Sequence, residues 1–290
     1  MLVAVMGLLL SAGMPSAYGS TVIAFDAAAS NSCTSCLVTL TWPHTIGGGT
    51  NGILIVGVSE FGNDPAPPPL PPVVSIMYGS SSLTFIAAQN DLTNVVVRAE
   101  AWYLLNPPTG TASITVTFSS IPVVGGSVVG GSVSYFNVAG LGTSNSATSL
   151  STTSGNPASV TVNANAGDLV TDVLAMNAES IIPATPGVGQ TPRWNVAPPT
   201  SSLVGAGSDK PASSPVTMTW TGVNVPIWAL IGIDLQPAPT TFPAVHQTPV
   251  GGIMLPSIGL TVLLPWAVVL SLLGVLSVEA FRVKRRAKQR

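Results

Sequence analysis

Apolar and polar residues alternate with a period of two in several short segments of this chain. The pattern occurs in residues 37–42, 113–118, 159–162 and 216–220. In the second of these, Ile114, Val116 and Phe118 alternate with serine and threonine. Because successive side chains of a β-strand point to opposite faces, the pattern predicts strands with one buried side, as in antiparallel sheets.

Further strands are predicted between Gly-, Pro- and Asn-rich turns. Residues 53–58 and 227–235 are apolar on both faces and are expected to be central strands, and 95–105, 127–138 and 169–176 are further candidates. About a dozen strands predict an all-β fold, one large antiparallel β-sandwich of jelly-roll or concanavalin-like type. Two immunoglobulin-like domains joined by a linker at 142–157 are the alternative.

The C-terminal region has the composition of a membrane anchor. Ile258–Val278 carries no charged residue, and as a helix it would be about 32 Å long, enough to cross a bilayer core. A basic cluster follows: Arg282, Lys284, Arg285, Arg286, Lys288 and Arg290. Since basic flanks stay in the cytoplasm, we expect a single transmembrane helix at 258–281 and a cytoplasmic tail at 282–290.

The N-terminal residues predict the same topology. An apolar run at Leu2–Leu10 precedes Ala17, Tyr18 and Gly19, which is typical of a secretory signal peptide covering 1–19, although no basic residue precedes the run. An N-terminal strand or anchor is the alternative. The expected organisation is an extracellular β-sandwich at 20–236 and a Pro-rich stalk at 237–257, with the protein in the cell membrane.

The expected external part is acidic. Residues 20–252 contain ten acidic and three basic residues. This charge argues against nucleic-acid binding, which requires basic surface, and against adhesion to anionic lipid. The expected partners are the membrane itself and cell-envelope polysaccharide or neighbouring surface proteins.

The chain contains two cysteines, Cys33 and Cys36. In an oxidising compartment this spacing predicts a local disulfide, whereas in a reducing one it would indicate redox chemistry or half of a zinc site. The disulfide is the preferred interpretation, because no second cysteine pair exists.

The sequence contains no recognisable catalytic motif, so we do not expect an enzyme. Its only histidines are His44 and His246, and no Gly-x-Ser-x-Gly segment occurs. Asp168 and Asp172 are four residues apart on an expected strand, about 13 Å, which is too far for a glycosidase pair. No cofactor is predicted. An acidic jelly roll is compatible with structural calcium, but the sequence names no ligands for it.

Arg98, Glu100 and Trp102 are expected on one face of the strand at 95–105. A charged pair beside an indole could form a platform for a sugar ring. The preferred interpretation is a cross-strand ion pair covered by Trp102.

Trp194 is a second candidate for ligand binding. It lies among Gly and Pro residues, which predicts an exposed loop, and an exposed loop tryptophan is unusual. The other indoles on expected strands are predicted to be in the core: Trp42, Trp220 and Trp228.

Several segments carry a family resemblance: 51–58, 74–85, 101–108, 166–173 and 226–236. They resemble a recurrent, uncharacterised β-sandwich module of secreted microbial surface proteins. The C-terminal end is similar to microbial sorting-type tails, with Gly251 and Gly252 at the motif position. The resemblance implies a fold and a location. The expected function is that of a membrane-anchored surface protein with a structural or adhesive ectodomain. A surface-displayed carbohydrate-binding module is the alternative, and a secreted hydrolase is a remote one.

Overall fold

The regular structure of the described residues consists of antiparallel β-strands, as expected. A computed structural model describes residues 21–62, 70–91, 96–121, 126–149, 157–177, 182–222 and 227–240, which all belong to one compact unit. The signal peptide, most of the stalk, the membrane span and the basic tail predicted from the sequence lie outside the described residues.

The strands form four sheets. The first inner sheet has the order β1 (Ala24–Thr34), β9 (Ser127–Phe136), β3 (Ile53–Gly62), β7 (Val96–Leu105) and β6 (Thr84–Asp91). The second inner sheet has the order β10 (Val138–Thr148), β17 (Ile227–Pro237), β12 (Leu169–Asn177), β15 (Leu203–Pro211) and β14 (Thr191–Val196).

Two smaller sheets complete the set. The first outer sheet contains β2 (Thr39–Ile46), β8 (Gly110–Phe118), β4 (Val73–Tyr78) and β5 (Ser81–Ser82). The second outer sheet contains β11 (Ala158–Val162), β16 (Val216–Thr221) and β13 (Thr185–Pro186).

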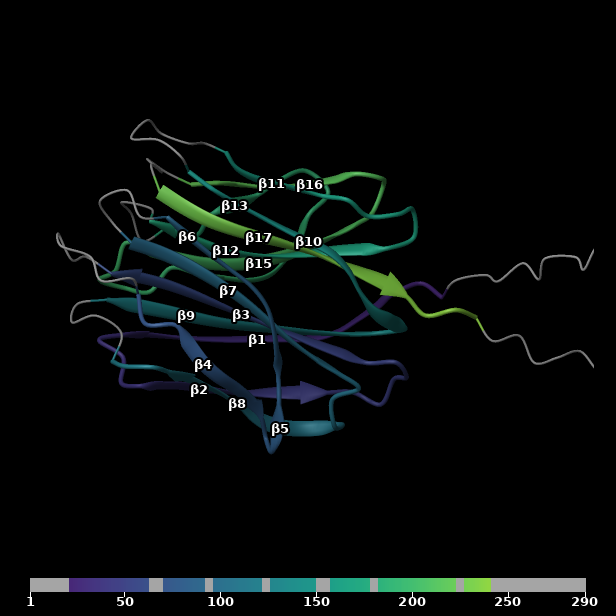
Figure 1. The fold of residues 1–290 in the computed structure, drawn as a ribbon, viewed down its shortest axis with the longest axis horizontal. Coiled ribbons are helices and arrows are strands. Elements are labelled where there is room, and N and C mark those ends of the chain that lie inside the picture. Colours follow the sequence, from purple (N-terminus) through teal and green to yellow (C-terminus); the bar gives the residue numbers. More distant parts are fainter. Residues whose placement is uncertain are drawn as a thin grey trace, which may run out of the picture. The chain divides into compact units, whose positions relative to one another are not determined.

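The four sheets are stacked in layers, outer, inner, inner and outer (Figure 1). Each gap between layers holds its own apolar core. Ile55 and Ile231 lie between the two inner sheets, Leu40 and Val56 between the first inner and outer sheets, and Val160 between the second pair. The predicted all-β, antiparallel sandwich class is confirmed, and the four sheets form two sandwiches that share a central core.

The two sandwiches have the same topology. In chain order, β1, β3, β6, β7 and β9 occupy the same positions in the first inner sheet as β10, β12, β14, β15 and β17 in the second. In the outer sheets, β2, β8 and β4 correspond in the same way to β11, β16 and β13. The structure is thus an internal duplication, with the first half ending near residue 137.

The duplication is also visible in local sequence and hydrogen bonding. Residues 30–34 read Ser-Asn-Ser-Cys-Thr and 144–148 read Ser-Asn-Ser-Ala-Thr. Asn31 donates through Nδ2 to the carbonyl of Thr41, 2.8 Å, and Asn145 donates to the carbonyl of Thr161 over the same distance. In each half this asparagine ties the first strand of the inner sheet to the first strand of the outer sheet.

The halves pack through matching elements. β6 of the first half contacts β10 of the second, and β14 of the second half contacts β1 of the first. At the first contact Ser146 donates to Gln89, 2.8 Å, and Thr148 donates to Asp91, 2.9 Å. This reciprocal pattern is that of an isologous, two-fold interface within one chain.

Two predicted segments differ from the structure, while the predicted central strands agree with it. β3 and β17 are central and buried, as expected. The expected strand at 127–138 is in fact β9 and the start of β10, separated by Asn137, whose φ of 63° is in the left-handed region. The alternative prediction of an inter-domain linker at 142–157 is wrong for its first part, because residues 142–148 belong to β10, which pairs with β17.

Candidate functional site

Arg98, Glu100 and Trp102 share one face of β7, as the alternation predicts. The Glu100 carboxylate accepts hydrogen bonds from Arg98 Nε at 2.7 Å and from the main-chain N–H of Val73 at 3.0 Å. Its second oxygen accepts from Trp102 Nε1 at 3.1 Å. The three residues therefore form one hydrogen-bonded cluster.

This cluster is buried, which restricts its chemistry. Trp102 is 9% exposed, Glu100 is 1% exposed, and Phe85 packs edge-on against the indole with ring centroids 5.2 Å apart. A sugar platform requires an open aromatic face, so the geometry favours the interpretation of an ion pair covered by Trp102. The closest partner of Arg98 is on its own strand, while the cross-strand carboxylate of Glu60 lies 3.9 Å from Arg98 Nε.

Glu60 lacks a hydrogen-bond partner at both carboxyl oxygens and is 1% exposed. Burial raises the pKa of Glu60 well above its usual value, and the charge of Glu100 raises it further, while Arg98 opposes the shift. The guanidinium of Arg98 therefore pairs with Glu100 and compensates the carboxyl group of Glu60 less well.

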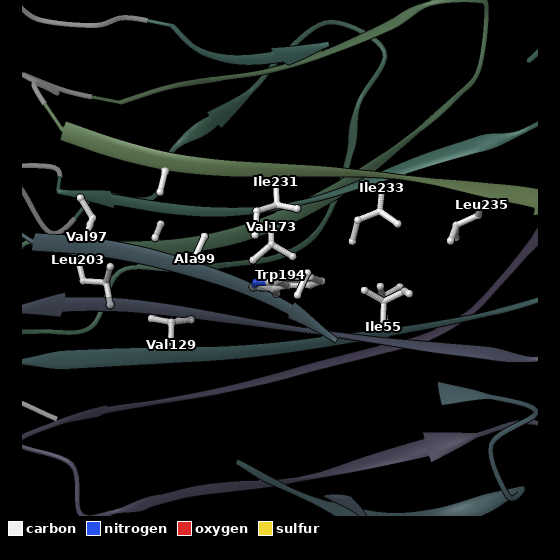
Figure 2. Packing of buried hydrophobic residues seen from close by; sticks show 14 of the residues in the cluster. Ile55, Val97, Ala99, Val129, Val173, Trp194, Leu203, Ile231, Ile233 and Leu235 are labelled. Atoms are coloured by element: carbon white, nitrogen blue, oxygen red, sulfur yellow. The ribbon is translucent and has the colours of Figure 1, made fainter. Parts of the chain in front are cut away.

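Trp194 is not in an exposed loop, so that prediction is wrong. It lies on β14, is 5% exposed and belongs to the core between the two inner sheets (Figure 2). A loop was predicted because Pro192 is close in sequence. In the structure Pro192 lies on an edge strand, where proline is tolerated, and the register with β15 shifts between Pro192 and Trp194.

The Trp194 indole lies against glycines of three strands. A Cβ added at Gly131 of β9 would be 2.1 Å from the indole, and one added at Gly207 of β15 would be 2.2 Å away. Gly57 of β3 is the register partner of Gly131, and its added Cβ would be 3.0 Å from the same ring. The indole of Trp194, a residue of the second half, therefore fills the space left by Gly57 and Gly131 of the first half and packs the two halves together.

A buried hydrogen-bond chain crosses the first sandwich. Trp42 Nε1 donates to Ser132 Oγ at 2.9 Å, and Ser132 Oγ lies 2.9 Å from His44 Nδ1. His44 Nε2 lies 3.0 Å from Ser134 Oγ, which donates to Asp26 at 2.7 Å. The chain orients every member if His44 carries its proton on Nε2.

The same residues do not form a catalytic triad. In a triad the carboxylate orients the histidine, whereas here Asp26 accepts from the serine. Ser134 is 1% exposed and His44 is 2% exposed, so a substrate does not reach the hydroxyl. Burial lowers the pKa of His44 from 6.5 to about 4, although nearby Asp26 raises it in part. The histidine is neutral and structural at pH 7.

The second sandwich has a different polar centre. Asp172, fully buried on β12, accepts from the main-chain N–H of Ser208 at 2.6 Å and from Trp220 Nε1 at 2.7 Å. Burial raises the pKa of Asp172 to about 7, and these hydrogen bonds counteract the shift in part. Trp42, Trp220 and Trp228 are all buried, as expected, and the first two anchor the polar centres of the two halves.

An uncharged groove lies at one end of the first sandwich. It consists of two adjacent hollows, about 260 and 180 Å³ in volume, that share Thr109. Asn51 and Asn106 line the larger hollow beside Phe136, and their side-chain amides make no hydrogen bond within the described part of the chain. No single residue or motif points to this site, because it combines turns distant in sequence.

The predicted disulfide is confirmed, with Cys33 at the end of β1 bonded to Cys36. Between residues 21 and 240, no helix of the described ranges is long and apolar enough to cross a membrane. No group of three or more His, Cys, Asp or Glu side chains in those ranges is placed to hold a metal ion. The basic residues of the tail lie outside the description: Arg282, Lys284, Arg285, Arg286, Lys288 and Arg290.

The sequence matches no known protein-family model, and no curated protein is similar enough to count as a match.

Proposed function

We propose that the protein is a membrane-anchored cell-surface protein whose duplicated β-sandwich has a structural or adhesive role. In this proposal each half is a jelly-roll sandwich, and the resemblance to secreted microbial surface modules reflects a common architecture. The anchor is a single helix at 258–281, held by the basic residues that follow it.

The observation that carries the proposal is the position of the two ends of the folded region. Thr21 donates through its main-chain N–H, 2.9 Å, and its hydroxyl, 2.7 Å, to the carbonyl of Ala238. The N–H of Ala238 donates to Asn137, 2.8 Å, at the junction of the halves. The chain therefore leaves the sandwich beside its start, which suits a domain attached at one end and projecting from a surface.

The polar interior supports a structural role over catalysis. His44, Asp172 and Glu100 are each buried and engaged in hydrogen bonds that tie one strand or sheet to another. A general acid or base needs to reach its substrate, so groups in such positions stabilise the stack and do not take part in a reaction.

The proposal is tested by comparing cells that display the protein with cells that release it. A chain ending before Ile258 should be secreted, and the full-length chain should fractionate with membranes and promote cell–cell contact or retention of the surface layer. Equal aggregation and equal fractionation of the two forms would contradict the proposal.

Carbohydrate binding at the uncharged groove is the second candidate. Free amides beside an aromatic ring suit a neutral sugar, which offers hydroxyl groups and an apolar face. The groove lies near Asn137 and hence near the end of the domain where the chain leaves it, which restricts access for a large polymer. Glycan-array binding that disappears on Asn106→Ala and persists on Thr45→Ala, an exposed position on β2, would favour this candidate.

A further inference from the structure

Two carboxyl groups of the second sandwich lie side by side. Asp234 pairs with Val170 of β12, and Asp168 precedes Leu169, the partner of Leu235. Residues 168 and 170 project to the same face, so Asp168 is the diagonal neighbour of Asp234, and the two carboxyl groups contact each other.

The pair is buried and has no basic partner. Asp234 is 2% exposed and Asp168 is 7% exposed. The ion pairs of the described residues all involve Arg98 or Arg193, so no ion pair compensates these two charges.

The two carboxyl oxygens of Asp234 have different surroundings. Oδ2 lies against the backbone bulge of β10, where a Cβ added at Gly142 would be only 1.9 Å away. The other oxygen, Oδ1, is buried and has no partner. A buried carboxyl oxygen without a donor is costly, and a bound cation would compensate it.

The turn before β12 and the bulge of β10 hold the two carboxyl groups. Asp168 accepts from the N–H of Asn165, 2.7 Å, at the turn that precedes β12. On the other side, the Thr143 hydroxyl donates to the carbonyl of Asn163 and links the bulge to the same turn. Thr143, whose main chain also hydrogen-bonds Asp234, therefore brings a hydroxyl and the carbonyl of Asn163 to the segments that hold the two carboxyl groups.

We propose that Asp168 and Asp234 bind one calcium ion, with its remaining ligands drawn from the oxygens of Thr143, Asn163 and Asn165 and from water. Calcium accepts six to eight mixed oxygen ligands in irregular geometry, whereas magnesium requires a compact octahedron. Two carboxylates balance its charge, and the bound ion would tie β10, β12 and β17 together at one end of the second sandwich.

The first half provides an internal comparison. Asn31 pairs with Gly130 as its equivalent Asn145 pairs with Gly232, which sets the correspondence between the two inner sheets. Ser132 is therefore the counterpart of Asp234, and Leu54 is that of Asp168. The first sandwich folds with neither carboxylate at these positions. The acidic pair is therefore not a requirement of the strand arrangement, which is consistent with a ligand-binding role.

The test measures calcium binding by the full-length protein in detergent. Titration calorimetry and the thermal unfolding midpoint are recorded with chelator, with CaCl₂ up to 10 mM and with equal MgCl₂. At a hundredfold excess over the dissociation constant, calcium should raise the midpoint by about 5 to 10 °C. Asp234→Ser, which places the residue of the first half at this position, should abolish both the heat of binding and the shift.

Asp26→Asn, at a half-buried carboxylate of the first sandwich, is the matched control and should retain the calcium response. If Asp234→Ser does not fold, Asp168→Asn replaces it. The proposal is overturned if calcium neither binds nor shifts the wild-type midpoint, if magnesium is equally effective, or if the response survives in a folded variant at Asp234 or Asp168.

Discussion

Removing the indole of Trp194 should destabilise the whole stack. The side chain is 5% exposed and lies between the two inner sheets, against Gly57, Gly131 and Gly207 (Figure 2). Truncation of a buried tryptophan to alanine costs about 3–5 kcal/mol, because the lost contacts leave a cavity. For a domain of this size we expect the thermal unfolding midpoint of Trp194→Ala, followed by far-ultraviolet circular dichroism, to fall by about 6–20 °C.

A double-mutant cycle isolates the contact. Gly131→Ala alone should cost about 1–3 kcal/mol, since its Cβ would be 2.1 Å from the indole. In the Trp194→Ala background the same change meets no ring and should cost far less. Val188→Ala, at an apolar residue that is 96% exposed, is the control and should cost less than about 1 kcal/mol. A Trp194→Ala loss as small as that, or strictly additive effects, would refute the role of Trp194 as the wedge between the halves.

Further predictions concern pH and the disulfide. The folded pKa of Asp172 is about 7 and its ordinary value 3.8, so its protonation stabilises the fold fully below pH 3.8 and this contribution, about 4 kcal/mol, is lost as the pH rises through 7. Urea titrations of Asp172→Asn should lack this loss, and a difference from wild type that does not vary with pH would contradict it. His44 has the opposite sign: its folded pKa of about 4 means that stability decreases by about 3 kcal/mol as the pH falls from 6.5 to 4, a decrease that should be absent in His44→Gln. Cys33→Ser should lower the free energy of unfolding by about 2 kcal/mol, because the disulfide closes a short loop, and a loss well above that would show a larger role.

The strand pattern was predictable because alternation reports which side of a strand is buried. β8, β11 and β16 alternate as the sequence indicates, and the apolar runs at 53–58 and 227–235 are the buried centres of the inner sheets. Some strands that escaped prediction are rich in small or polar residues. β10 contains Gly, Ser, Thr and Asn, and its strand conformation is imposed by pairing with β17.

The duplication was present in the sequence but weak. Ser-Asn-Ser recurs at 30–32 and 144–146, and Thr115-Val116-Thr117 resembles Thr217-Met218-Thr219. These matches involve few residues, because a strand needs only the alternation and not a particular side chain. Sheet order, which makes the repeat obvious, depends on pairings between distant strands that local periodicity does not encode.

The candidate sites were harder to predict than the strands. Alternation placed Arg98, Glu100 and Trp102 on one face correctly, but exposure depends on which sheet covers that face. Trp194 shows the same limit, since its neighbours in sequence indicate a loop while its neighbours in space are glycines of other strands. The Asp168–Asp234 pair joins residues that are far apart in sequence, and only strand register brings them together.

The central claim, a sandwich outside the cell held by a helix with a cytoplasmic tail, is tested most directly by lysine labelling. Lys210 is the only lysine before the expected span, and Lys284 and Lys288 follow it. With a membrane-impermeant amine reagent on intact cells, mass spectrometry should find modification at Lys210 and none at Lys284 or Lys288 until the membrane is permeabilised. Labelling of the tail lysines on intact cells, or protection of Lys210 until permeabilisation, would contradict the proposed topology.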